Sequence, residues 1–248
     1  MKPIVTAVIP ALDEEAVIGE VVAGIPRAIV TEVIVVDNGS TDATAARAIA
    51  AGARVVREPQ RGYGRACAAG TRAVSAACTI IVFLDGDGSD VAEEIDTLVA
   101  PIARGEFDFV IGSRTRGVRE RGSMVPHQVF AGRLAGALIA RLYGVSYTDM
   151  SPFRAISREL FDRLSMTERT YGWNLEMQIL VARSGARILE LPVPHRRRSG
   201  GSSKVSGTFV GTFGAATKIL WLLARAAYMH RARFKSSARS TSIRSRVP

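Results

Sequence analysis

Short apolar runs rich in valine and isoleucine alternate with longer stretches of helical spacing along this chain of 248 residues. Five of these runs are expected to form strands, at residues 4–10, 32–36, 54–57, 79–84 and 107–112. They are too short for buried helices, and their nearly continuous apolar character is typical of strands covered on both faces. Helices are expected between them, at residues 15–25, 42–51, 65–77 and 92–104. The alternation predicts an α/β fold with a doubly wound, mostly parallel central sheet flanked by helices.

The second half of the chain is less regular and predicts a single main domain over residues 1–207. Its further elements are expected to be helices at 127–143 and 173–184 and strands at 151–156 and 187–193. Beyond this domain, apolar side chains at helical spacing predict an amphipathic helix over residues 208–232. The basic, serine-rich residues 233–248 predict a disordered tail.

The net charge of +10 is unevenly distributed along the sequence. The last acidic residue is Glu190, and 12 basic residues follow it, which leaves 21 basic and 23 acidic residues in the first 190 positions. This distribution indicates a near-neutral body followed by a basic segment, and it argues against a nucleic-acid binder. A hydrophobic content of 47% excludes disorder across the whole chain.

Other features of the composition indicate a chain of the reducing cytoplasm. The two cysteines, Cys67 and Cys78, do not form a disulfide scaffold and are expected to be buried thiols. The three histidines lack the spacing of a zinc site. Uninterrupted apolar runs stay below the ~18 residues of a membrane span, and the first run meets acidic residues too early for a signal peptide.

Acidic residues directly follow several predicted strands. Ligands of doubly wound sheets bind at the carboxyl ends of the strands, so these residues are candidates for a binding site. Asp85 and Asp87, separated by one glycine, follow a fully apolar strand, and two such carboxylates can face one hard cation. Asp90 with Glu93 resembles a capping box of the next helix instead. The sequence therefore predicts a site for Mg²⁺ or Mn²⁺ at Asp85 and Asp87.

The motifs of competing nucleotide-binding classes are missing from the sequence. The first strand ends in a proline and three acids rather than in the glycine-rich turn that a dinucleotide requires. Residues 62–67 lack the third glycine of that motif and follow the third strand. Neither a P-loop motif nor a G-x-S-x-G elbow occurs. A hydride transferase and a P-loop enzyme are both disfavoured.

An ordered set of segments resembles family 2 glycosyltransferases of the GT-A fold. In the first half these segments are P-A-L-D-E-E, V-V-D-N-G-S-T-D, R-G-Y-G-R-A, F-L-D-G-D-G and I-G-S-R. The resemblance continues through T-D-M-S-P-F-R-A, Y-G-W-N-L-E-M and R-S-G-G-S-S-K, so it covers about residues 4–210. It is closest to dolichyl- or polyprenyl-phosphate mannose and glucose synthases.

The resemblance implies roles for individual residues. The nucleotide pocket would be lined by Pro10, Ala11, Asp13, Glu15, Asp37, Gly64, Arg65, Asp85 and Gly86. In the family, the residue at Asp37 meets the base or ribose, and those at Gly64 and Arg65 lie in a loop over the nucleotide. Asp85 and Asp87 would hold the metal with the diphosphate. Many relatives have Asn at the position of Asp13 and Gln at that of Ser89.

The same resemblance implies phosphate-binding residues. Arg114, Arg198 and Lys204 would bind the donor diphosphate or an acceptor phosphate, which suits the forked guanidinium and the compact ammonium. The catalytic candidates are Asp87, Arg114 and Asp149.

The need for a general base depends on the acceptor. A lipid phosphate is already anionic and needs no base, whereas a hydroxyl acceptor needs a carboxylate that takes its proton. Asp149 is the first candidate for this base and Glu176 the second. Alternatively, Asp149 caps a turn or orients Arg154.

The expected function is metal-dependent, inverting transfer of a hexose from a UDP- or GDP-sugar to a polyprenyl phosphate (dolichyl or undecaprenyl phosphate). The transfer is expected at the cytoplasmic membrane face, with the helix at 208–232 and the basic tail on anionic lipid. Three alternatives remain: a hydroxyl acceptor, a final helix packed on its own domain, and a non-catalytic module that binds nucleotide sugars or membranes. No nucleic-acid partner is expected.

Overall fold

A single seven-stranded sheet forms the centre of the molecule. The computed structural model describes residues 2–199. The sheet has the strand order β3-β2-β1-β4-β6-β5-β7. Its strands are β1 (Val5–Ala11), β2 (Glu32–Asp37), β3 (Arg54–Arg57), β4 (Ile80–Phe83), β5 (Phe109–Ser113), β6 (Arg154–Ser157) and β7 (Ile188–Pro192). All neighbouring strands are parallel except β6, which runs antiparallel to both β4 and β5.

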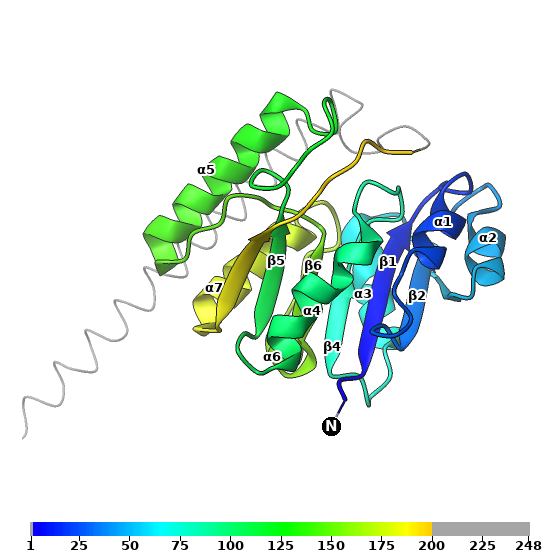
Figure 1. Ribbon diagram of the computed structural model, residues 1–248, viewed down its shortest axis with the longest axis horizontal. Coiled ribbons are helices and arrows are strands. Elements are labelled where there is room, and N and C mark those ends of the chain that lie inside the picture. The colour runs from blue at the N-terminus through cyan, green and yellow to red at the C-terminus, as the bar shows by residue number, and fades with distance from the viewer. Residues whose placement is uncertain (1, 200–248) are drawn as a thin grey trace, which may run out of the picture.

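Helices cover both faces of this sheet (Figure 1). They are α1 (Ile18–Ala23), α2 (Thr44–Ala50), α3 (Tyr63–Ala73), α4 (Ile95–Ala103), α5 (Pro126–Tyr143), α6 (Arg158–Arg163) and α7 (Trp173–Ser184). A short 3₁₀ turn, η1 (Ala92–Glu94), precedes α4. Figure 1 shows α5 beyond the end of the sheet at which β5 ends.

The alternation of side chains along each strand divides the core into two layers. In β1, Val8 packs with residues of α3 and α7, whereas Ala7 and Ile9 pack with residues of α1 and α4. Both layers are buried, which explains why the strands are apolar throughout rather than alternating. Gly70 of α3 allows close helix–sheet contact, because a Cβ there would lie 2.4 Å from Cγ1 of Val8.

The predicted fold class is confirmed: an α/β fold with a mostly parallel sheet flanked by helices. Two features of the second half differ from the prediction. The strand expected at 151–156 lies at Arg154–Ser157 and is antiparallel. It leads directly into α6, a helix that was not predicted. In the first half, α1 begins only at Ile18, because residues 12–17 form turns bonded to the loop after β2.

Both cysteines are buried and unbonded to each other, as expected. Within residues 2–199, no helix combines the length and the apolar character that a membrane crossing requires. The amphipathic helix expected at 208–232 and the tail at 233–248 lie outside the described residues, as does Lys204.

Candidate active site

The loops that follow β1 and β2 are bonded to each other at the carboxyl edge of the sheet. Asp13 accepts hydrogen bonds at Oδ1 from the backbone N and the Oγ1 of Thr41, at 2.8 and 3.2 Å. Its own backbone N donates to Oγ of Ser40 at 3.0 Å. Glu15 accepts at Oε2 from the backbone N of Ala43 at 2.8 Å. Asp13 and Glu15 therefore shape the rim of the site through the loop after β2.

Asp37 ends β2, directly beside Ala11 of β1 in the sheet register. It is buried, and its Oδ1 accepts from the backbone N of Ser40 at 2.9 Å. The neighbouring Asn38 holds the loop after β3: its Nδ2 donates to the carbonyls of Glu58 and Gln60, both at 2.9 Å. Asn38 is not among the predicted site residues, although its place directly after a strand could have indicated it.

Gly64 and Arg65 lie in the first turn of α3, not in a loop as the resemblance implied. Their backbone N–H groups donate to the carbonyls of Thr170 and Arg169, at 3.1 and 3.0 Å. A Cβ on Gly64 would lie 2.7 Å from the carbonyl carbon of Arg169. Gly64 is therefore required for the close packing of residues 168–170 on the start of α3.

The loop after β4 carries Asp85 and Asp87. Oδ1 of Asp85 is buried and has no hydrogen-bond partner among the described residues. Burial raises the pKa of Asp85 well above its usual range, and the nearby carboxylates of Asp87 and Asp90 raise it further. Oδ1 of Asp87 accepts from both N and Oγ of Ser89, at 2.9 and 2.6 Å. Acidic side chains crowded together in this way are a natural arrangement for binding a cation.

The prediction that Asp90 and Glu93 form a capping box is wrong. Oδ2 of Asp90 accepts from the backbone N of Asp85 at 3.1 Å, while the residue at the start of η1 is Val91 with no side-chain cap. Asp90 thus supports the loop of Asp85 rather than the next helix. At the start of α2, the backbone N of Thr44 donates to Oδ1 of Asp42 at 3.0 Å.

The end of β1 lies against this acidic loop. A Cβ on Gly86 would lie 3.2 Å from the carbonyl oxygen of Pro10 and 3.3 Å from Cβ of Ala11. The structure thus brings together Pro10, Ala11 and Gly86, which the resemblance had assigned to one nucleotide pocket.

The residues present fit a Mg²⁺ or Mn²⁺ ion with an incomplete protein shell. Asp85 and Asp87 offer carboxylate oxygens, which hard cations prefer. No group of three or more histidine, cysteine or acidic side chains placed to hold a metal occurs within residues 2–199. Such a site takes its remaining ligands from water and phosphate, as Mg²⁺ sites commonly do.

Arg198 reaches the acidic loop from the segment after β7. Its Nε lies 3.4 Å from Oδ2 of Asp87, and its Nη2 donates to Oε1 of Glu14. Backbone bonds hold this segment in place: the N of Arg196 donates to the carbonyl of Ser89 at 2.9 Å, and the N of Ser199 to that of Asp87 at 3.3 Å. A guanidinium is therefore present beside the acids of the proposed metal site.

Asp149 and Arg114 form a buried, two-pronged ion pair. Nε of Arg114 donates to Oδ2 of Asp149 and Nη2 donates to Oδ1, both at 2.8 Å, and the backbone N of Arg114 also donates to Oδ2. Burial acts to raise the pKa of Asp149, but these bonds and the charge of Arg114 outweigh it and hold the pKa below its usual range. Both oxygens of Asp149 are occupied, which is unfavourable for a general base. Asp149 orients Arg114, not Arg154.

Two further acids act on loops of the site. Glu190 of β7 accepts at Oε1 from the backbone N–H groups of Thr148 and Asp149, at 2.9 and 3.3 Å. Glu176, the second candidate base, accepts from the N and Oγ1 of Thr167 and from the N of Glu168. The carboxylate of Glu176 is therefore committed to the segment that packs on α3.

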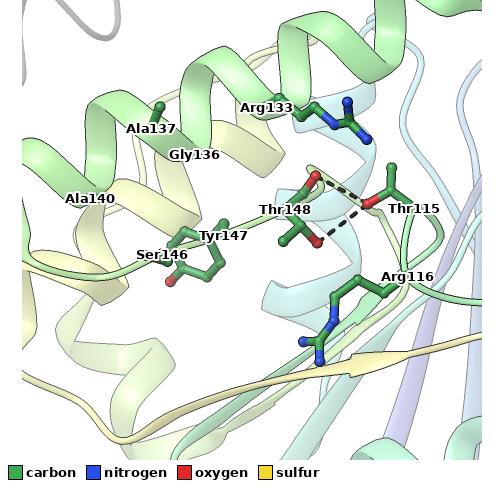
Figure 2. A pocket seen from close by; sticks show the side chains of 9 residues that line it. All are labelled: Thr115, Arg116, Arg133, Gly136, Ala137, Ala140, Ser146, Tyr147 and Thr148. Carbon is green, nitrogen blue, oxygen red and sulfur yellow. Dashed lines mark hydrogen bonds between the residues drawn. The ribbon is translucent and has the colours of Figure 1, made fainter.

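A pocket of about 330 Å³ lies beside the Arg114–Asp149 pair. Its lining comes from α5 and from the segments after β5 and before β6: Thr115, Arg116, Arg133, Gly136, Ala137, Ala140, Ser146, Tyr147 and Thr148. Figure 2 shows Arg133 on one side and Arg116 on the other, with Thr115 and Thr148 hydrogen-bonded between them. The pocket thus combines two guanidinium groups with hydroxyls and small apolar helix residues.

Comparison with known proteins identifies the family. Residues 6–165 match the model of glycosyl transferase family 2, and the chain belongs to this family of enzymes. An uncharacterized glycosyltransferase of Mycobacterium tuberculosis is 37% identical over 212 residues, covering 84% of this chain and 92% of that protein. The undecaprenyl-phosphate mannosyltransferase of Micrococcus luteus is 30% identical over 196 residues, covering 73% and 78%.

Solved structures agree with this assignment. Glucosyl-3-phosphoglycerate synthase from M. tuberculosis, crystallised with Mn²⁺ and UDP-glucose, has a TM-score of 0.68 and 29% identity, covering 90% of this chain and 79% of that one. Its complex with phosphoglyceric acid has a TM-score of 0.70 and 28% identity. The fold and the sequence therefore both define a family 2 glycosyltransferase of the GT-A type.

Proposed function

We propose that this glycosyltransferase moves a hexose from a UDP- or GDP-sugar to the phosphate of a polyprenyl phosphate, with inversion and with Mg²⁺ or Mn²⁺ at Asp85 and Asp87. The observation that carries the proposal is the meeting of Asp85, Asp87 and Arg198 at the carboxyl edge of the sheet. A diphosphate is the ligand that such a mixture of acids and a guanidinium suits, because the acids hold a cation and the arginine binds oxygen atoms.

Departure of the nucleoside diphosphate is the step for which charge must be neutralised. The metal ion, when bound, supplies Lewis-acid stabilisation of that leaving group. Arg198 adds a second positive charge on the side of Asp87, and Lys204, which follows shortly in the sequence, would add a third. The loops of Asp13 and Asp37 and the first turn of α3, which contains Gly64, border the same edge, where the nucleoside would lie.

Attack by an acceptor phosphate requires positioning but no proton transfer, because the nucleophile is already anionic. The ion pair of Asp149 with Arg114 is consistent with such a reaction, since its carboxylate carries a lowered pKa and both oxygens are engaged. Arg116 and Arg133 of the adjacent pocket would bind the acceptor phosphate. The name of one similar protein supports this choice, because the relative from Micrococcus luteus is an undecaprenyl-phosphate mannosyltransferase.

Replacement of Asp87 tests the proposal directly. In a detergent assay with labelled donor, polyprenyl phosphate and Mn²⁺, Asp87→Asn is expected to lower kcat/KM about 100-fold or more, because a ligand of the charge-neutralising cation is lost. Asp162→Asn, on the exposed side of α6, is the matched control and should stay within about twofold of the wild type. Full turnover of Asp87→Asn in the presence of a chelator would contradict the metal assignment.

A soluble phosphate-bearing acceptor with a reacting hydroxyl is the second candidate, and the small pocket of about 330 Å³ lined by Arg116 and Arg133 favours it. In this case Asp149 would act as the base. An assay with polyprenyl phosphate and 3-phosphoglycerate as acceptors separates the two functions, because it shows which of the two acceptors is glycosylated.

A variant of Asp149 gives a second test. If Asp149→Asn abolishes turnover while donor binding stays intact, this result would support the hydroxyl acceptor. Donor hydrolysis in Mn²⁺ without any acceptor would exclude a mere binding module.

The proposed location is the cytoplasmic face of a membrane, where a polyprenyl phosphate is accessible. In this proposal residues 208–232 form an amphipathic helix on the lipid and the basic residues 233–248 contact anionic headgroups.

A further inference from the structure

An exposed apolar surface lies around the N-terminal half of α5 and the loop that precedes it. The described residues include six exposed large hydrophobic side chains, and four of them fall within residues 118–134. Their exposed fractions are 83% for Val118, 37% for Val125, 69% for Phe130 and 40% for Leu134. Single exposed hydrophobic residues are ordinary, but four of them within one segment of the chain indicate a binding surface.

Two of these four side chains belong to one side of α5. Phe130 and Leu134 are one turn apart and therefore lie next to each other on α5. The opposite side of α5 is occupied: Ala135 and Ile139 are buried in the core layer that also contains α7. The helix is therefore apolar on two sides, and only one of them is covered within residues 2–199.

The charge around these side chains is mainly positive. Residues 114–143 contain six arginines and one acid, Glu120. Arg133 and Arg141 are exposed on α5 itself, and Arg119 and Arg121 are exposed in the loop before it. Exposed apolar side chains surrounded by arginines are complementary to a lipid bilayer, whose apolar acyl chains lie beneath anionic headgroups.

We propose that Val118, Val125, Phe130 and Leu134, the α5 surface, insert into the headgroup region of an anionic lipid bilayer. The arginines around them bind lipid phosphates, and the apolar side chains enter the acyl boundary. This contact is separate from the one proposed for residues 208–248. It rests on the proposed function only in its consequence: the pocket between Arg116 and Arg133 would then open at the depth of the headgroups, where the phosphate of a polyprenyl acceptor lies.

Tryptophan fluorescence of the full chain locates this contact. Phe130→Trp is compared with Ile49→Trp, which replaces a residue of α2 with a similar exposed fraction, 60%. With vesicles of phosphatidylglycerol and phosphatidylcholine, the added emission of Phe130→Trp is expected to shift to the blue and to be quenched by brominated acyl chains. That of Ile49→Trp is expected to change in neither respect. The unsubstituted protein supplies the baseline for its own tryptophans.

A second variant measures how much the surface contributes to binding. The double variant Phe130→Ser with Leu134→Ser is expected to bind these vesicles about tenfold more weakly or worse, because two apolar side chains no longer enter the bilayer. Ile49→Ser is expected to bind as the wild type does. With a short-chain, water-soluble polyprenyl phosphate in solution, the double variant should turn over as the wild type does, since neither residue lines the pocket.

Three results would overturn the proposal. The first is that the full chain does not bind anionic vesicles, and the second is that the emission of Phe130→Trp is neither shifted nor quenched in vesicle-bound protein. The third is that Phe130 mediates self-association of the protein in place of lipid binding. Failure of the proposed function is a different result, because inactivity towards polyprenyl phosphate leaves the quenching of Phe130→Trp unchanged.

Discussion

At the scale of single residues, the buried ion pair of Arg114 and Asp149 has the strongest consequences. Three hydrogen bonds join the two residues, and Asp149 accepts a fourth from the backbone N of Met150. A carboxylate that is removed from water is stable in its charged form only with such partners. The pair therefore keeps Arg114 aimed at the edge of the site in one orientation.

Asp149→Asn is expected to destabilise the protein by about 3 kcal/mol at neutral pH, because Arg114 keeps its charge and loses its counter-ion. The lowered pKa sets the sign of the pH dependence. The stabilisation by Asp149 is present above the ordinary aspartate pKa and is lost as the pH falls through the lower pKa of the folded state. The difference in the free energy of unfolding between wild type and variant, measured by urea denaturation, should therefore become smaller below about pH 4. A gap that widens towards acid would contradict this assignment.

The role of Arg154, which belongs to the segment T-D-M-S-P-F-R-A, is decided by the tertiary structure. It is fully buried in β6, where it donates to the carbonyl oxygens of Ser151 and Asn174 and lies 6.0 Å from the ring of Phe109. Burial lowers its pKa to about 10. The sequence places an arginine in a predicted strand, but it does not reveal that this strand lies between two others in the centre of the sheet.

At the scale of elements, the contact between α3 and residues 168–170 is the one most sensitive to a small change. Gly64→Ala is expected to lower the free energy of unfolding by about 1–3 kcal/mol, because its Cβ would meet backbone atoms at 2.7 and 2.8 Å. It should also weaken binding of the nucleotide sugar, since α3 borders the proposed donor site.

Gly19→Ala is the matched control. Gly19 lies in another helix, α1, and its added Cβ would have no neighbouring atom within 4 Å. Alanine favours a helix, so this variant should be as stable as the wild type or up to about 1 kcal/mol more stable. Thermal denaturation of both variants and donor titration by calorimetry provide the measurements. Equal stability of the two variants would contradict this prediction, because residues 168–170 would then move away from the added Cβ without loss of stability.

At the scale of the whole molecule, the site depends on contacts between the two ends of the described chain. Arg198 donates to Glu14, 184 positions earlier, and lies beside Asp87 of the central loop. The side chain of Arg198 is about a quarter exposed, so the contact lies at the boundary of the site rather than in the core. Its main effect should therefore be on ligand binding.

Arg198→Ala is expected to raise the KM for the nucleotide sugar about tenfold or more, with a smaller effect on kcat, because a charged hydrogen-bond donor to the diphosphate is removed. The KM of Arg198→Lys should lie between those of the wild type and Arg198→Ala, since lysine keeps the charge but not the forked geometry. Arg196→Ala is the control, because this neighbouring side chain is exposed and only its backbone bonds to the acidic loop. An unchanged KM in Arg198→Ala, measured in steady-state assays, would remove this residue from the donor site.

The sequence by itself determined the local elements and the chemistry at their ends. The apolar runs predicted β1 to β5 and their helices within a few residues, because strand and helix periodicities are local properties. Asp85 and Asp87 could be selected from the sequence, since they directly follow a strand and such ends share one edge of a parallel sheet.

Only the tertiary structure decided which distant residues meet. The antiparallel insertion of β6, the pairing of Arg114 with Asp149, and the approach of Arg198 to Asp87 all join segments far apart in the chain. The same holds for Asp90, whose spacing to Glu93 suggested a helix cap but whose carboxylate supports Asp85. Strand pairing and ion pairing depend on the packing of the whole sheet, which leaves no periodic signal in the sequence.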